Sequence, residues 1–83
     1  NAGTLLPFRV LDAVPQDQVF SLRIYNLRGQ LVHTLFEGFV QPGYNTLSWD
    51  GLDKYGNPIA SGTYFYRLES GDATLARKLL LVR

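Results

Sequence analysis

The chain contains no cysteine and no methionine. Without cysteine it can form no disulfide, no thiolate metal site and no thiol nucleophile. The packing of one core must therefore hold its 83 residues together, and a domain of this size buries roughly 60–65% of the surface that its unfolded chain exposes. The lack of an initiating methionine predicts a processed product or an excised piece of a longer protein.

The chain also lacks an excess of charge of either sign and any long apolar run. Eight basic and seven acidic residues are interspersed and leave a formal charge of +1. Nucleic-acid-binding domains concentrate basic residues in a stripe, whereas here only Arg77, Lys78 and Arg83 cluster, which argues against nucleic acid as a partner. The longest apolar run, Leu79 to Val82, is too short to span a membrane, and no signal-peptide pattern is present.

Glycine, proline and asparagine divide the chain into segments of strand length. The clearest alternation runs from Val19 to Asn26, where Phe20, Leu22 and Ile24 share one face. This period of two is typical of a half-buried antiparallel strand.

A hairpin follows this strand. Arg28 and Gly29 predict a tight turn, and residues 30–36 predict the returning strand. The sequence does not settle which face of this strand points inward, because Val32 and Leu35 have opposite parity; a β-bulge would reconcile them.

Four further segments complete the predicted fold. We expect an edge strand or a bulge over Thr4 to Leu11, because Pro7 cannot donate to a ladder. Further strands are expected over Tyr44 to Trp49, Thr63 to Glu69 and Ala73 to Val82. Six or seven short strands predict an all-β, Ig-like antiparallel β-sandwich, formed without a disulfide by residues 1–83 as a single domain.

The segment from Trp49 to Arg67 holds the candidate metal ligands Asp50, Asp53 and Asn57. Calcium takes six to eight oxygens, and two carboxylates with one amide fall short of that set. We favour the interpretation that these side chains hydrogen-bond their own backbone and hold successive turns. We expect no cofactor.

The sequence also offers no arrangement of side chains suited to catalysis. Two carboxylates in one tight turn have no cleft between them, unlike the acid/base pair of a glycosidase. His33 is the single histidine, lies within a strand and is expected to point outward. We therefore predict that the chain is not an enzyme.

The aromatic residues could form a sugar-binding platform, but strand parity argues for another arrangement. Trp49 shares a face with Leu47 and Tyr64 with Leu68, which predicts that both rings lie in the core. Three candidates for exposure remain, Tyr25, Tyr44 and Tyr55, and scattered exposed aromatic residues are ordinary. Gly62 two positions before Tyr64 predicts a tyrosine corner, in which the hydroxyl returns to the backbone upstream.

Three segments together carry a resemblance to a known family: IYNLRGQLVHTL, QPGYNTLSWDGLDKYGNPIASGTYFYRL and TLARKLLLV. They resemble the Ig-like domain of flagellar-hook capping proteins and the C-terminal sorting domains of proteins exported by the type IX secretion system. The residues of the motif, to which we assign structural roles, are Pro42, Gly43, Tyr44, Trp49, Asp50, Gly51, Asp53, Gly56, Gly62, Tyr64 and Tyr66.

The sorting-domain resemblance implies a non-catalytic C-terminal module of a larger secreted protein, read by the export machinery of the outer membrane on the way to the cell surface. It places recognition on the last strand, at Lys78, Leu79, Leu80, Leu81, Val82 and Arg83. One feature departs from it, because Thr4 to Leu11 does not reproduce the Asn-Pro-rich stretch that usually precedes the first strand. The alternatives are a structural scaffold of the flagellar-hook capping type and an accessory carbohydrate-binding module.

Overall fold

The computed structural model describes residues 4–10, 18–71 and 73–82. It contains six strands: β1 (Thr4–Val10), β2 (Phe20–Tyr25), β3 (Leu31–Gly38), β4 (Gly43–Trp49), β5 (Gly62–Ser70) and β6 (Ala73–Leu81). The described part of the chain has no helix, and so none that could cross a membrane.

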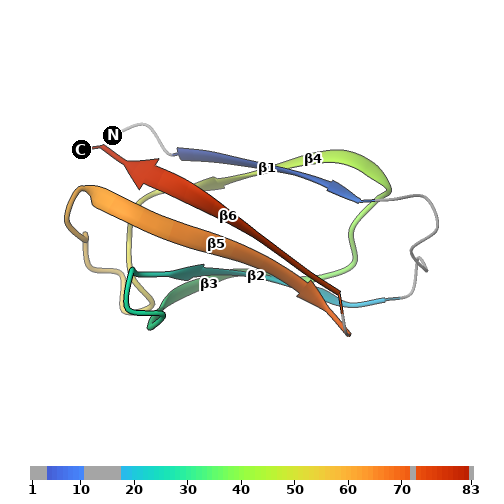
Figure 1. Ribbon diagram of the computed structural model, residues 1–83, viewed down its shortest axis with the longest axis horizontal. Coiled ribbons are helices and arrows are strands. Elements are labelled where there is room, and N and C mark those ends of the chain that lie inside the picture. The colour runs from blue at the N-terminus through green and yellow to red at the C-terminus, as the bar shows by residue number, and fades with distance from the viewer. Residues whose placement is uncertain (1–3, 11–17, 72, 83) are drawn as a thin grey trace.

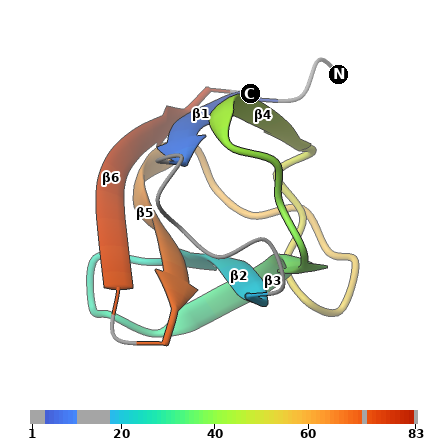
Figure 2. The same ribbon diagram turned by 90° about the vertical axis from the view of Figure 1, so that its right-hand side faces the viewer.

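The strands form two antiparallel sheets that face each other across the core (Figures 1 and 2). One sheet has two strands, in the order β1-β4, and the other has four, in the order β3-β2-β5-β6. This arrangement confirms the predicted all-β, Ig-like sandwich, with six strands rather than seven. Leu11, the last residue of the predicted first strand, lies outside the described residues.

The core forms because apolar residues alternate along the strands. In β2, Phe20, Leu22 and Ile24 are 6%, 0% and 0% exposed, which confirms the predicted inward face. The other buried apolar residues come from the facing strands and from β5 and β6: Leu6, Phe8, Val10, Trp49, Tyr66, Leu68, Leu79 and Leu81.

The predicted bulge in the returning hairpin strand is present, and it occurs twice. Leu22 pairs with Phe36 but Arg23 pairs with Thr34, so Leu35 is an extra residue in β3. In the same way Ile24 pairs with His33 and Tyr25 with Leu31, so Val32 is extra. A bulge lets neighbouring side chains turn toward one face, and both Val32 and Leu35 pack against the core.

The bulges also correct the prediction for His33. Its partner across the ladder is the fully buried Ile24, and His33 is half-buried instead of pointing outward. Its Nδ1 atom is buried and has no hydrogen-bond partner among the described residues. The prediction was wrong because strict alternation does not continue through a bulge.

A side-chain hydrogen bond joins the two sheets directly: the Tyr66 hydroxyl of β5 donates to the Pro7 carbonyl of β1 at 2.8 Å. The amide nitrogen and carbonyl of a residue in an antiparallel ladder point to the same side. Pro7 therefore turns both groups away from β4, where the missing N–H costs no ladder bond. The backbone groups of Pro7 thus point to the free edge of β1, as expected for a proline in an edge strand.

Tyr66 makes stability depend on pH in the alkaline range. Burial raises the pKa of its phenol above the usual 10.0, and Arg77 lowers it in part. A raised folded-state pKa means that the contribution of Tyr66 is complete below pH about 10 and is lost as the pH rises through the folded-state value. We expect urea denaturation to show this alkaline loss, and Tyr66→Phe to reduce it while costing about 1 kcal/mol at neutral pH.

Tyr44→Phe is the matched control, because Tyr44 is 86% exposed and should leave both the stability and its pH dependence unchanged. An equal alkaline loss in wild type and Tyr66→Phe would contradict the assignment to Tyr66.

Candidate functional site

Trp49 ends β4 and organises the loop that follows it. The side chain is 1% exposed, and its indole N–H donates to the Leu52 carbonyl at 3.0 Å. Its ring meets Tyr64 edge to face, with centroids 5.7 Å apart and planes at 78°, a favourable aromatic geometry. Trp49 is therefore a core residue, as strand parity predicts, and cannot serve as a sugar-binding surface.

The candidate metal ligands Asp50 and Asp53 accept hydrogen bonds from the backbone. Asp50 Oδ1 accepts the Leu52 N–H at 3.2 Å. Asp53 Oδ1 accepts two, from Tyr55 and Asn57, both at 2.9 Å. This is the geometry that the turn-holding interpretation expects.

Asn57 completes the same turn through its backbone, since its carbonyl accepts the Asp53 N–H at 2.8 Å. Gly51 and Gly56 have φ angles of 78° and 82°, which only glycine adopts readily. Within the described residues no group of three or more His, Asp and Glu side chains gathers closely enough to hold a metal ion.

The loop also contacts the large sheet. The Lys54 N–H donates to the Val32 carbonyl at 2.9 Å, so the loop lies against the outer edge of β3. Val32 is one of the bulged residues, and its carbonyl is turned away from the β2 ladder. Sequence reasoning missed this contact, because nothing local marks it.

Tyr64 forms the predicted corner. Its hydroxyl donates to the Ala60 carbonyl, four residues upstream, at 2.7 Å. The bond ties the end of the loop to the start of β5, which fits a structural role for the Gly62 and Tyr64 motif.

The remaining tyrosines do not gather into a platform. Tyr44 and Tyr55 are 86% and 77% exposed, on β4 and on the loop, and each lies beside a cation of its own, Arg9 or Lys54. The prediction that Tyr25 is exposed needs correction, because it is half-buried, with the Arg67 guanidinium 4.7 Å from its ring centroid.

The predicted recognition residues of the last strand divide between two faces. Lys78 and Leu80 are exposed on the outer face of β6, and Val82, just beyond the strand, is also exposed. Leu79 and Leu81 are only 6% and 5% exposed and belong to the core, so they are unavailable to a partner. Arg83 lies outside the described residues.

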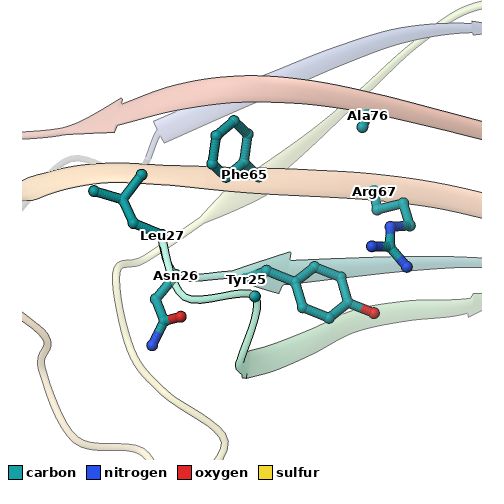
Figure 3. Close-up of a pocket in the computed structure, with 7 residues that line it drawn as sticks. Tyr25, Asn26, Leu27, Phe65, Arg67 and Ala76 are labelled. Atoms are coloured by element: carbon teal, nitrogen blue, oxygen red, sulfur yellow. The ribbon is translucent and has the colours of Figure 1, made fainter.

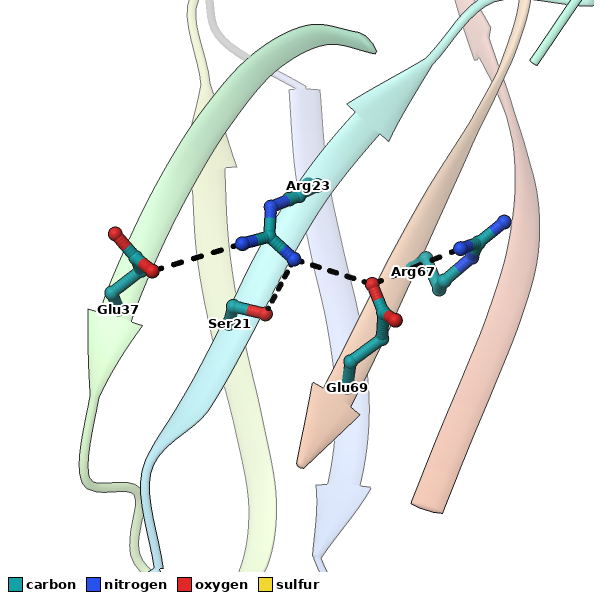
Figure 4. Close-up of polar contacts among 5 residues, drawn as sticks. All are labelled: Ser21, Arg23, Glu37, Arg67 and Glu69. Carbon is teal, nitrogen blue, oxygen red and sulfur yellow. Dashed lines mark hydrogen bonds and ion pairs between the residues drawn. The ribbon is translucent and has the colours of Figure 1, made fainter. Parts of the chain in front are cut away.

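An ion-pair cluster covers one end of the outer face of the large sheet (Figure 4). Arg23 extends between two carboxylates, 3.8 Å from Glu37 and 3.3 Å from Glu69, and also donates to Ser21. Arg67 lies 3.8 Å from the same Glu69 oxygen. Pairs as open to solvent as these contribute only about 0–1 kcal/mol each, so their main effect is to neutralise both carboxylates locally.

A shallow groove lies farther along the same face (Figure 3). Its volume is about 170 Å³, and it is lined by Tyr25, Asn26, Leu27, Gly29, Phe65, Arg67 and Ala76. Small-molecule sites usually occupy about 300–1,000 Å³. The groove is therefore of a size for one protein side chain rather than for a substrate.

These observations define the class of the molecule: an Ig-like β-sandwich in which the aspartates and tyrosines of the main motif support turns and packing. The model of the FlgD Ig-like domain family matches residues 10–74. The chain belongs to this family, whose domains are structural and non-catalytic. Searches of curated proteins and of solved structures found no significant match.

Asp53 offers a direct test of the turn. We expect Asp53→Ala to lower the free energy of unfolding by about 1–2 kcal/mol, since two backbone N–H groups lose their acceptor. Asp50→Ala removes a single longer bond and should cost less; both are measured by chemical denaturation. A melting temperature that millimolar calcium raises in wild type but not in Asp53→Ala would instead identify a metal site.

Proposed function

We propose that the chain is a non-catalytic structural module, which holds a larger protein in an assembly through protein–protein contacts, as in the flagellar-hook capping type. The observation that carries this proposal is the internal use of the family motif. Trp49, Asp53 and Tyr64 all bond to backbone of the domain itself. What the domain offers to other molecules is therefore its faces and edges.

The surface of the described residues supports this proposal. Large apolar side chains are exposed on it at several places, and those more than half exposed are Leu5, Val19, Leu27, Phe39, Tyr44, Tyr55, Leu80 and Val82. Two of them lie at the large sheet: Leu27 lines the groove, and Leu80 is exposed on the outer face of β6. Exposed apolar side chains that gather together are a common sign of a protein-binding surface.

The proposal is tested in the parent protein. Cells producing the parent with and without this domain are compared by native gel and size-exclusion chromatography. We expect the intact parent to migrate in a larger complex and the truncated parent to migrate alone.

A fold-disrupting variant, Trp49→Ala, should behave like the truncation, since losing a buried aromatic ring costs about 3–5 kcal/mol. Ser48→Ala, which changes an exposed polar side chain outside that apolar set, is the control and should assemble normally. A truncated parent that assembles normally would refute the structural role.

The second candidate is the sorting and anchoring of a secreted protein by the type IX system. The exposure of Lys78, Leu80 and Val82 at the end of β6 favours it, because a sorting signal must be accessible. If the domain is a sorting signal, residues 1–83 fused behind a periplasmic reporter in a type IX host should carry the reporter outside the cell. Retention in the periplasm would exclude this role.

A further inference from the structure

The two edges of the four-stranded sheet differ in how they are protected. At one edge, β3 carries two bulges, at Val32 and Leu35. The Lys54 N–H of the loop also bonds to the Val32 carbonyl on that side. Bulges and covering loops are two of the devices by which proteins prevent another strand from pairing with an edge, so β3 is blocked.

The opposite edge, β6, carries neither a bulge nor a covering loop among the described residues. Its nine residues pair with β5 in unbroken register, from Ala73 opposite Ser70 to Leu81 opposite Gly62. Among the described residues no strand pairs with its other side. A long, regular edge presents a row of backbone N–H and C=O groups that can accept a further strand.

Two adjacent cations determine which strand this edge can accept. Lys78 faces outward, opposite Phe65, while Arg77 lies opposite Tyr66 on the inner side and is still exposed. Neither forms an ion pair with a described residue, whereas Arg23 and Arg67 hold the carboxylate of Glu69 farther along the sheet. A second copy of β6 would bring more cations to this edge and is disfavoured, while a strand with carboxylates at successive positions would match a cation on each face.

The groove supplies a third element of recognition. Ala76 lines it, lies on β6 and pairs with Arg67 of β5. Neighbouring strands lie about 4.8 Å apart, so a side chain of an added strand beside Ala76 has only a methyl group to pass before it reaches the groove. The walls there are Phe65 and the Arg67–Tyr25 stack, which suit an apolar side chain.

From these three features we propose that β6 binds an extended segment of another protein as an added antiparallel strand. Acidic residues of that segment face Lys78 and Arg77 at consecutive positions, and the residue after them is apolar and enters the groove beside Ala76. The inference rests on the proposed function, that the domain works through protein contacts, and names the chemistry of the partner.

The probe is a synthetic peptide as long as β6, acetylated and amidated, with Glu-Glu-Leu at its centre and alternating Thr and Val on both sides. We expect titration into the ¹⁵N-labelled chain to shift the amide signals of residues 74–82 and those of Tyr25, Phe65 and Arg67. The amides of β3 should stay unchanged. A peptide with Lys-Lys-Leu at its centre should produce no shifts.

Charge reversal makes the test specific. The double variant Arg77→Glu with Lys78→Glu should bind the acidic peptide about tenfold more weakly, because two exposed ion pairs are replaced by repulsion, and it should gain binding of the lysine peptide. The control, Arg9→Glu with Lys54→Glu, changes the net charge equally at exposed sites outside β6 and the groove and should keep the wild-type affinity.

Shifts confined to β3, or equal weakening in both double variants, would overturn the proposal. Absence of binding together with a positive assembly test in the parent would also overturn it, and would leave the structural role to another surface. Loss of the structural role itself would appear in the assembly test, whatever the peptide does.

Discussion

The burial of Trp49 is the constraint on which the rest of the structure depends. The ring fills the space between the sheets where β4 ends, and its indole N–H bonds to the Leu52 carbonyl. Its edge-to-face contact with Tyr64 places the start of β5. Since the Tyr64 hydroxyl in turn bonds to Ala60, one buried side chain positions β4, the whole loop and β5 together. An aromatic anchor of this kind suits a sandwich without a disulfide.

The position of the loop has a consequence at the far side of the large sheet. Held by Trp49 and by the turns around Asp53, the loop lies against β3, where Lys54 bonds to Val32. The same packing that stabilises the core therefore places the loop over one edge of the sheet, β3. The other edge, β6, is left without that cover. The difference between the two edges, which decides where a partner strand can pair, follows from the position of the loop.

Electrostatics and packing act in the same direction on the outer face. Arg23 lies between Glu37 and Glu69 and neutralises both at one end of the sheet (Figure 4). Lys78 and Arg77 on β6 then remain as cations without a described carboxylate, next to the groove of Figure 3. In the two-stranded sheet, the Pro7 carbonyl is already bonded to Tyr66, so the free edge of β1 lacks a donor at Pro7 and has that acceptor occupied.

Local patterns in the sequence determined much of the architecture. Alternation at Phe20, Leu22 and Ile24 was enough to predict the inward face of β2, because the period of a strand is a property of neighbouring residues. In the same way, the spacing of Gly62 and Tyr64 predicted the corner. The order of the motifs pointed to two families, and the family model supports one of them, the flagellar-hook capping Ig-like family. The opposite parity of Val32 and Leu35 left the inward face of β3 open, and a bulge was the feature that would reconcile them.

The tertiary structure alone decided the position of each bulge, and with it the inward turn of His33, because that position depends on the register between β2 and β3. It also placed Arg67 over Tyr25 and brought Arg23 to Glu69, 46 residues away. Pairing with β5 likewise settled which face of the last strand is buried. It puts Leu79 and Leu81 in the core and Lys78 outside. The physical reason is the same throughout: strand period is local, whereas register, edges and charge pairing arise between segments that only folding brings together.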